Sequence, residues 1–543
     1  MPGASLHWPT ALPPLCPELI LPDHLTDSLQ QRLALLSGAD ALPLLRELRR
    51  GIEKESLRID RDGELAQTPH PQDAGSALTH PLITTDYSEA LMEFITPVSA
   101  RVEESLEQLD QIHRFTYQTL DDESLWSASM PCVMGPDEAI PVAQYGSSNS
   151  GRMKTIYRVG LGYRYGRRMQ TIAGIHYNFS IPELLWPLLG RHDQAGVTDA
   201  YFGLIRNFRR TVWLLVYLFG ASPALCRSFV EGRKHNMQDF DDCTLYLPHA
   251  TSLRMGDLGY QSNAQESLHI CYNRLDTYIG TLKHAILDAY PDYQRIGINV
   301  DGEYRQLSAG LLQIENEFYS PIRPKRVARR GETALTALAH GGVEYIEVRC
   351  IDVNPYQPVG IDAEQMRFLD AFLLACLLND SPAGDEADNA ENKRNLRAVV
   401  NTGRDPELML TRRGKPLAMC DWAEELMAQI APIAELLDRA NGGDLHRASV
   451  AKQIAKLGDP NLTPSAQVLA DMRSQNTSWG SFALQQSQRH AEYFRSRPLE
   501  AGKLAPFIDM AERSLAAQAE LERNNKPPFD DYLAHYFDQY RAL

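Results

Sequence analysis

The 543-residue chain is long enough for one large domain with a satellite or for two to four ordinary domains. Its 43% hydrophobic and 23% charged residues are typical of a globular protein, and its net charge of −16 argues against general binding to nucleic acids or anionic membranes. The N-terminus lacks the basic segment of a signal peptide, and the eight cysteines show no paired spacing, so we expect free thiols in a reducing, cytoplasmic environment.

After a Pro-rich arm, the first predicted strand carries two carboxylates on one face. In the segment GIEKESLRID, extended geometry places Glu53 and Glu55 side by side. A third acid follows in LMEFITPV, residues 91–98, which is compatible with a helix or a strand; its Phe-Ile-Thr run favours the strand. A helix would align Asp86 with Glu93, whereas a strand adds Glu93 to the acids of the sheet.

The segment QYGSSNSGRMKTIYR, residues 144–158, is predicted to be a Gly/Ser-rich loop. Its glycines have the spacing of a P-loop, but Arg and Met stand where that motif needs Lys and Ser or Thr, so a P-loop is excluded. Two interpretations stay open. The segment is either a flexible turn or a loop whose backbone N–H groups bind an anion together with Arg152, Lys154 and Arg158.

The strand TIAGIHYNFSIP, residues 171–182, is predicted to place His176 and Asn178 on a polar face that backs onto an apolar one. A lone buried histidine is more often a satisfied core residue than a metal ligand. Further along the chain we expect an amphipathic helix over 197–220, a loop with Arg254 and Tyr260, and a helix over 264–289 that ends before Pro291.

The segment LLQIENEFYSPIRPKR, residues 311–326, is predicted to be another strand with charged residues on one face. Glu315, Glu317 and Tyr319 alternate with apolar residues there. This alternation fits a functional face, and it equally fits the solvent-facing side of an ordinary antiparallel sheet.

The strongest strand prediction is VEYIEVRCIDVNPY, residues 343–356, where Glu347 and Arg349 share a face with Ile351. Charged groups in so apolar a strand need partners, which are either a metal and a phosphate or simply each other in a cross-strand ion pair. Beyond it the chain is predicted to be mainly helical, with a helix over 363–378, a charged linker near 380–394 and a helix that ends before 442–443.

The predicted strands together offer several carboxylates, one imidazole and one guanidinium. Like charges a few ångströms apart repel strongly, so converging carboxylates need cations. Oxygen ligands with one imidazole suit Mg²⁺ or Mn²⁺, and a neighbouring arginine suits the charge that develops in phosphoryl transfer. The residues that form this set are Glu53, Glu55, Glu93, His176, Glu315, Glu317, Glu347 and Arg349.

Eight motifs in register give the chain a family resemblance over roughly residues 30–535. They are GIEKES, TTDYSEALMEFITP, MPC, QYGSSNSGRMKTIYR, TIAGIHYNFS, TSLRMGDLGY, IENEFYSPIRPKR and GGVEYIEVRCIDVNP. In this order they resemble the proteobacterial type of glutamate–cysteine ligase, the ATP-dependent first enzyme of glutathione synthesis. The resemblance implies an α+β fold with a largely antiparallel catalytic sheet like that of glutamine synthetase, flanked by helices, and a mostly helical C-terminal region.

The resemblance also implies roles for individual residues. The metal-binding residues would be Glu53, Glu55, Glu93, His176 and Glu347, with Asp86 as an additional acid; the substrate pocket would contain Tyr157, Arg254, Tyr260 and Tyr319. Arg349 would meet the transferred phosphoryl group and, with Glu347, act in catalysis. Arg158 and Lys154 are the further candidates for phosphate or nucleotide contact, whereas Glu315 and Glu317 receive no role beyond sheet structure or support of the site.

The implied reaction phosphorylates the γ-carboxylate of L-glutamate with ATP, and the amine of L-cysteine then displaces phosphate. Alternatives are a ligase with another amine acceptor and a two-metal hydrolase. We expect a monomer whose partners are small molecules, and we expect no binding to nucleic acids or membranes. The expected division is an arm over 1–29, a catalytic α+β domain with helical insertions over 30–362, and a mainly helical region over 363–543 packed on it.

Overall fold

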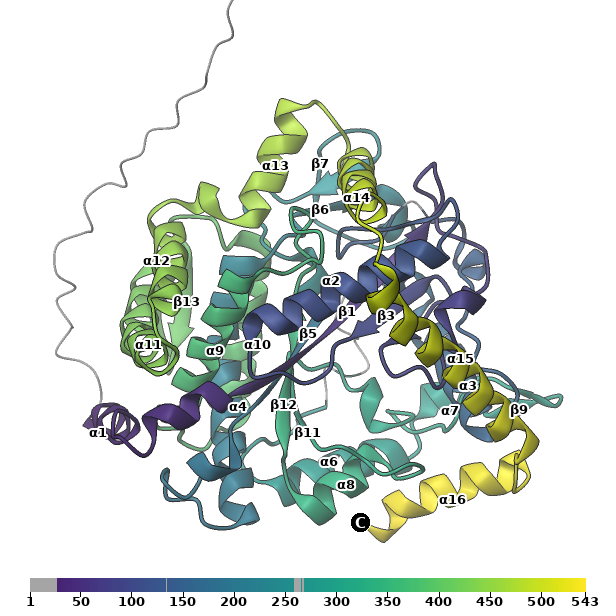
Figure 1. Ribbon diagram of the computed structural model, residues 1–543, viewed down its shortest axis with the longest axis horizontal. Helices are drawn as coiled ribbons and strands as arrows, with labels where there is room; N and C mark the ends of the chain where they lie inside the picture. Colours follow the sequence, from purple (N-terminus) through teal and green to yellow (C-terminus); the bar gives the residue numbers. More distant parts are fainter. Residues whose placement is uncertain (1–26, 133, 258–264, 266–267) are drawn as a thin grey trace, which may run out of the picture.

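The computed structural model describes residues 27–132, 134–257, 265 and 268–543, and its centre is a seven-stranded sheet (Figure 1). The strands follow the order β11-β12-β5-β1-β3-β2, with β4 paired to β1, and each pairing is antiparallel. Their bounds are β1 Arg49–Ile59, β2 Ile83–Thr85, β3 Leu91–Ile95, β4 Ser124–Leu125, β5 Ile175–Ser180, β11 Ile322–Lys325 and β12 Tyr345–Ile351. The expected α+β class with a largely antiparallel sheet is confirmed, and LMEFITPV forms a strand.

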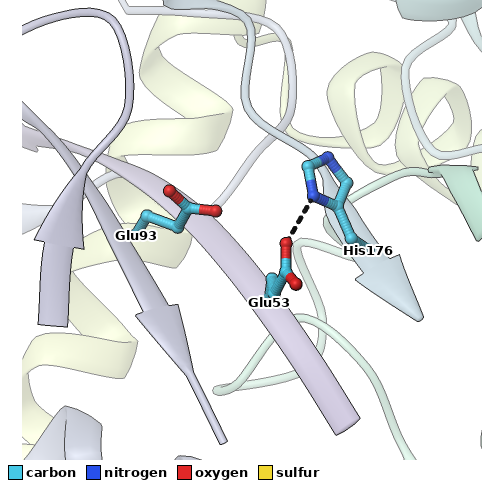
Figure 2. Close-up of side chains that lie close together, drawn as sticks. All are labelled: Glu53, Glu93 and His176. Atoms are coloured by element: carbon cyan, nitrogen blue, oxygen red, sulfur yellow. Dashed lines mark hydrogen bonds and ion pairs between the residues drawn. The ribbon is translucent and has the colours of Figure 1, made fainter. Parts of the chain in front are cut away.

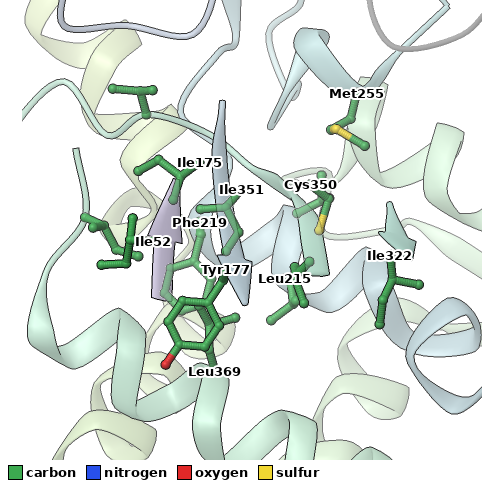
Figure 3. Close-up of a cluster of buried hydrophobic side chains, with 14 of the residues drawn as sticks. Ile52, Ile175, Tyr177, Leu215, Phe219, Met255, Ile322, Cys350, Ile351 and Leu369 are labelled. Atoms are coloured by element: carbon green, nitrogen blue, oxygen red, sulfur yellow. The ribbon is translucent and has the colours of Figure 1, made fainter. Parts of the chain in front are cut away.

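Helices cover the apolar face of this sheet. The helix α4, Gln194–Phe219, packs against β11 and β12, and α9, Ala363–Leu378, packs against α4. Figure 3 shows Ile52 and Tyr177 of the sheet gathered with Phe219 of α4 and Leu369 of α9. Because side chains alternate along a strand, the burial of Ile52 on this side turns its neighbour Glu53 to the opposite face.

The chain after β12 is almost entirely helical, as predicted. Its helices are α9, α10 Glu386–Thr402, α11 Met419–Asn441, α12 Leu445–Gly458, α13 Pro464–Ser474, α14 Trp479–Arg495, α15 Ala501–Arg523 and α16 Phe529–Ala542, with the hairpin β13 Met409–Arg412 and β14 Lys415–Ala418 between α10 and α11. The helix α9 has the predicted bounds, and α11 ends before Gly442 as predicted. The expected linker near 380–394 is shorter than predicted, because α10 begins at Glu386.

The remaining elements complete the fold around the sheet and its helical layer. The helices are α1 Asp27–Leu36, α2 Val102–Thr119, α3 Asn149–Tyr165, α6 Leu275–Leu287, α7 Pro291–Ile296 and α8 Ala334–Gly341. The small strands are β6 Ala224–Cys226, β7 Gln238–Asp239, β8 Thr244–Tyr246, β9 Asn299–Val300 and β10 Glu303–Tyr304. Within the described residues, no helix combines the length and the apolar character that crossing a bilayer requires.

Two strand or loop predictions were wrong because local composition was misleading. Residues 149–158, predicted as part of a Gly/Ser loop, begin the helix α3, and the Ser148 side chain caps it by accepting from the Gly151 N–H at 3.2 Å. Residues 311–319, predicted as a strand, instead contain a 3₁₀ turn over Glu315–Glu317, and the strand β11 begins only at Ile322.

Two further boundaries differ from the prediction. The predicted helix over 264–289 is shorter, because α6 begins at Leu275, and Pro291 opens the next helix, α7, as prolines commonly do. In β12 the register shifts between Val348 and Ile351, which pairs with Ile175. This bulge moves Ile351 into the apolar cluster, so it does not share the face of Glu347 as predicted (Figure 3).

Candidate active site on the central sheet

Four adjacent strands, β3, β1, β5 and β12, bring acidic side chains and a histidine to the same face of the sheet. Glu55 lies directly opposite Glu93, and Glu53 lies directly opposite His176. Residues directly opposite each other in antiparallel strands share a face and have neighbouring Cβ atoms. Glu347 reaches the group from β12, one strand beyond His176.

The distances show one continuous cluster. His176 Nδ1 lies 3.1 Å from Glu53 Oε2 and 3.8 Å from Glu347 Oε1, and its Nε2 lies 3.7 Å from Glu55 Oε1. The ligand atoms of Glu53, Glu93 and His176 lie within 4.8 Å of one another, and Figure 2 shows these three side chains turned toward a common point. The predicted metal-binding set, five residues from four strands, is therefore brought together.

The carboxylates of the cluster differ in their electrostatic surroundings. Burial and the negative charges of Glu53, Asp86 and Glu55 raise the pKa of Glu93 well above its ordinary value. Burial also raises the pKa of Glu55. Such like-charged carboxylates in a dry site cannot all ionise without a cation.

On the other side of the cluster, burial opposes the ionisation of Glu347, but Lys325, Arg349 and His176 together hold its pKa well below the ordinary value. Burial is the largest effect on Glu53 and raises its pKa, but the hydrogen bond with His176 and the electrostatic effects of His176 and Lys325 together lower it below the ordinary value. At the Glu93 end of the cluster the negative charges repel one another, whereas at the Glu347 end neighbouring positive charges compensate the carboxylate.

The donor set fits a divalent cation. A carboxylate only accepts hydrogen bonds, so Nδ1 of His176 donates to Glu53, and this leaves the lone pair on Nε2 for a metal ion. Nε2 of His176 and Oε2 of Glu347 are both buried and have no hydrogen-bond partner among the described residues. Oxygen ligands with one imidazole are those that Mg²⁺ and Mn²⁺ accept.

Basic side chains lie beside the Glu347 end of the cluster. Arg349 Nη1 is 3.2 Å and Lys325 Nζ is 3.5 Å from Glu347 Oε1. Glu347 is paired in register with Arg323 of β11. Sequence reasoning found Arg349 but missed Lys325, although Arg323 and Lys325 alternate with Ile322 and Pro324 in a short strand and so give a detectable signal.

Arg254 is fully buried next to the strand that carries Arg349. Its Nη2 donates to the backbone carbonyl of Arg349 at 2.9 Å, and its Nη1 lies 3.9 Å from Asp352. A Cβ at Gly174 would lie only 1.9 Å from Arg254 Nη2, so glycine is required for the guanidinium to occupy this position. The Gly174 N–H in turn donates to Glu55 Oε2 at 2.6 Å.

The basic residues of α3 lie near the acidic end of the cluster. Arg158 donates to the backbone carbonyls of Thr85, Asp86 and Lys154, so it fixes the segment that carries Asp86. Burial lowers the pKa of Lys154 to about 8, and Nζ lies 5.2 Å from the centre of the Tyr145 ring.

Two further expected substrate-pocket residues, Tyr157 and Tyr319, form hydrogen bonds with glutamine side chains. The Tyr157 carbonyl accepts from Gln313 at 3.1 Å, and Tyr319 exchanges hydrogen bonds with Gln170 at 2.9 and 3.2 Å. Tyr319 also lines a cavity of about 120 Å³. Tyr260 lies outside the described residues.

The comparison with known proteins decides the family. The model of the glutamate–cysteine ligase family matches residues 33–399. The chain belongs to the glutamate–cysteine ligase family. A glutamate–cysteine ligase of Pseudomonas paraeruginosa is 55% identical over 94% of the chain and 98% of the relative. That of Alcanivorax borkumensis is 52% identical over 94% of the chain and 99% of the relative.

Solved structures agree with this assignment. The Francisella tularensis glutamate–cysteine ligase in complex with AMP superposes with a TM-score of 0.86 at 38% identity, covering 91% of this chain and 98% of that one. A bifunctional glutathione synthetase of Pasteurella multocida has the same fold at 22% identity, with a TM-score of 0.67, and the match covers 90% of this chain and 58% of that one.

In this member of the glutamate–cysteine ligase family, Glu315 and Glu317 contribute to structure outside the sheet. Glu317 forms an ion pair with Arg164 at 2.8 Å and accepts from the Gln313 N–H at 2.7 Å. Glu315 accepts from the Leu335 N–H at 3.0 Å, at the start of α8. Neither contact joins these two acids to the cluster around His176.

Proposed function

We propose that the charged face of the central sheet is where this ligase joins the γ-carboxylate of L-glutamate to the amine of L-cysteine at the expense of ATP. The product would be γ-glutamylcysteine, with ADP and phosphate released, as the first step of glutathione synthesis. The observation that carries the proposal is the convergence of Glu53, Glu55, Glu93 and His176 with Glu347, directly beside the basic groups of Arg349 and Lys325.

The proposed metal site consists of the five clustered residues, with Asp86 as an additional acid. Mg²⁺ is the expected ion and Mn²⁺ the alternative, because both prefer oxygen ligands and retain water. When bound, the metal would neutralise phosphate charge and orient ATP. The raised pKa of Glu93 supports the proposal, since it results from burial and, in addition, from repulsion among acids that a cation would relieve.

The first chemical step needs positive charge around the transferred phosphoryl group. A γ-carboxylate oxygen of glutamate attacks the terminal phosphorus of ATP, the bond to the bridging oxygen breaks, and ADP leaves. We propose that Arg349, with Lys325 beside it, stabilises the negative charge that develops on the phosphoryl group. Glu347 orients both cations through its contacts at 3.2 and 3.5 Å.

The second step forms the amide bond. The cysteine amine attacks the acyl carbon, loses a proton, and phosphate leaves from the tetrahedral intermediate.

We propose Tyr157, Arg254, Tyr260 and Tyr319 as substrate-binding residues. The contact of Arg254 with the Arg349 carbonyl supports a coupling between the substrate pocket and the phosphoryl site. Lys154 and Arg158 stay predictions for nucleotide contact; the three carbonyl contacts of Arg158 support a role in holding Asp86.

The cellular setting and assembly are part of the proposal. The seven described cysteines are all free, which fits a reducing compartment such as the cytoplasm. We also propose that the enzyme acts as a monomer, because exposed large hydrophobic residues of the described part, such as Val98, Leu184 and Val327, are widely separated along the chain. Light scattering of the purified protein measures this directly.

The proposal is tested by a substrate-dropout assay that follows ADP release. ADP should form only with ATP, Mg²⁺, glutamate and cysteine together, and 2-aminobutyrate, serine and ammonia in place of cysteine test the choice of amine acceptor. Product release without nucleotide would instead indicate a hydrolase.

The same assay tests the site through Glu347→Gln. The rate should fall about a thousandfold, because the substitution removes the charge that organises Arg349 and Lys325. Glu303→Gln, in the exposed strand β10, is the matched control and should keep its activity. A folded Glu347→Gln variant with full activity would refute the assignment of the site.

A further inference from the structure

A large cavity lies among the helices that cover the apolar side of the central sheet, away from the acidic cluster. Its volume is about 390 Å³, and its walls come from α4, α9, α10, α11 and the hairpin β13–β14. Cavities of about 300–1,000 Å³ are the usual size for small-molecule sites. The reaction proposed above makes no use of this cavity.

The inner wall of the cavity is apolar. Phe372 and Cys376 of α9 contribute to it together with Trp422 and Ile430 of α11, and all four side chains are buried from solvent. Such a wall favours an aromatic or branched aliphatic group, because burial of apolar surface is the main source of affinity in small-molecule sites.

The outer wall carries two arginines, Arg210 and Arg413, which both line the cavity. Burial is the main cause that lowers the pKa of Arg210, and the positive charges of neighbouring arginines, Arg413 among them, add to it against the opposing effect of Asp388. Arg210 donates to the Pro382 carbonyl at 2.7 Å, but its nearest carboxylate, Asp388, is as far as 4.0 Å. Guanidinium groups in a cavity wall that have no carboxylate within hydrogen-bond distance favour an incoming anion.

The other charged groups of the cavity are already paired. Asp380 is bound to Arg32 at 3.0 Å, and Arg412 pairs with Glu425 outside the cavity. The Glu391 carboxylate accepts the backbone N–H groups of Arg413 and Gly414 at 2.9 and 2.8 Å. The guanidinium of Arg413, in contrast, has no hydrogen-bond or ion-pair partner among the residues that the structure describes.

The backbone of Arg413 supports a binding role for its side chain. Arg413 has a φ of 52° in the two-residue turn of the hairpin, a position that favours glycine or asparagine. A longer side chain in this conformation costs roughly 1–3 kcal/mol. Through these two hydrogen bonds Glu391 holds the turn against α10. The Arg413 side chain therefore lines the cavity despite the energetic cost of its backbone conformation.

We propose that this cavity binds a small organic carboxylate with an aromatic or branched apolar body. The carboxylate lies between Arg210 and Arg413, and the apolar body lies against Phe372 and Trp422. The side-chain amides of Asn392 and Gln429 also line the cavity without a partner among the described residues, and they can bond to a second polar group of the ligand.

Titration calorimetry of the full-length protein with 3-phenylpropionate tests this proposal. We expect saturable binding that persists in saturating ATP and glutamate, and no binding of 3-phenylpropylamine, which has the same apolar body with the opposite charge. Absence of saturable binding, equal binding of the amine, or displacement by glutamate would each overturn the proposal.

Two matched variants locate the bound molecule. Arg413→Asn removes the charge and suits the left-handed turn, so the affinity should fall about tenfold while ligase activity is unchanged, since one lost charged contact is worth about 1.4 kcal/mol or more. Lys415→Asn removes a cation of the same hairpin that does not line the cavity, and it should leave the affinity unchanged. Equal affinities of Arg413→Asn and the wild-type protein would contradict the assignment.

Discussion

At the scale of single residues, Glu93 illustrates the energetic cost that the proposed cation site would carry before a cation is bound. Its pKa is raised because burial and the charges of Glu53, Asp86 and Glu55 all disfavour its ionised form. In the proposed metal site, the same crowding would destabilise the metal-free protein and supply ligands for a bound cation. Function and stability therefore oppose each other at this position.

Replacement of Glu93 separates the two effects. Glu93→Gln should raise the melting temperature of the metal-free protein, because one of several repelling carboxylates is removed. It should reduce the stabilisation by Mg²⁺, which for the wild-type protein is about 2.7 kcal/mol at a hundredfold excess over Kd. Thermal unfolding with EDTA and with Mg²⁺ measures both, and an unchanged Mg²⁺ response would exclude Glu93 as a ligand.

Gly174 gives a second prediction at this scale, because its missing side chain makes room for Arg254. In Gly174→Ala the new Cβ would meet Nη2 at 1.9 Å, so the guanidinium must move away from the Arg349 carbonyl. We expect a loss of at least tenfold in kcat/KM together with lower stability.

Gly280→Ala is the control for this substitution. Nothing lies within 4 Å of a Cβ at Gly280 inside α6, so alanine should stabilise the protein by about 0.5–1 kcal/mol. Steady-state kinetics and chemical denaturation of the pair provide the comparison. Equal activity of both variants would show that Arg254 does not need its position.

At the scale of elements, alternation of side chains predicted the strands of the site correctly. The segments around Glu53, Glu93, His176 and Glu347 all form strands, because a two-residue period with one buried face is visible in each. The order of these strands in the sheet could not be deduced, since their pairing depends on contacts between residues far apart in the chain.

The failures at this scale have identifiable causes. Glu315 and Glu317 alternate with apolar residues, but their partners are the start of α8 and Arg164, which local sequence does not reveal. The glycines and serines of residues 144–158 suggested a loop, yet Gly151 lies in α3 and permits close packing, because a Cβ there would lie 2.2 Å from the Tyr145 carbonyl. Lys325 was missed because β11 is short and interrupted by Pro324.

The start of β2 gives a prediction for pH dependence. Nδ1 of His80 accepts the N–H groups of Leu82 and Ile83 at 3.1 and 2.9 Å, and burial lowers its pKa to about 4. The unfolded chain, with a histidine pKa near 6.5, binds the proton more readily, so this contribution is present above pH 6.5 and is lost as pH falls toward 4.

His80→Asn removes this titration and can keep an acceptor near the Nδ1 position. Between pH 7 and pH 5 the wild-type protein should lose about 2 kcal/mol more of its unfolding free energy than the variant. Urea denaturation at the two pH values measures the difference. Parallel loss in both proteins would show that His80 is not responsible.

At the scale of the whole molecule, the helix α16 is attached to the turn Glu315–Glu317 and to the start of α8. In α16, Gln539 accepts from the Thr333 N–H at 3.0 Å, and Tyr540 donates to Glu315. Phe529, Leu533 and Phe537 are buried in the same helix. The division into an arm, a catalytic domain and a helical region stays a prediction, because these contacts describe packing and not independent folding.

Deletion of residues 529–543 should lower the unfolding free energy by several kcal/mol, at about 1.5–3 kcal/mol for each buried side chain lost. Ligase activity should fall with it, because Glu315 loses one of its partners beside the segment that leads to Tyr319. His535→Ala, on the exposed side of α16, is the control and should change stability by less than about 0.5 kcal/mol. A deletion variant with the wild-type melting temperature would contradict this prediction.

Because β5 lies between β1 and β12 in the sheet, its two edges become paired at different times during synthesis on the ribosome. The strand β5 can pair with β1 early, but its other edge waits until β12 has been translated, roughly 10–30 s later at ordinary elongation rates. During that interval an unpaired strand edge next to Glu53 and His176 is available to other nascent chains. We therefore expect the yield of native enzyme to depend on chaperones that shield this edge during translation.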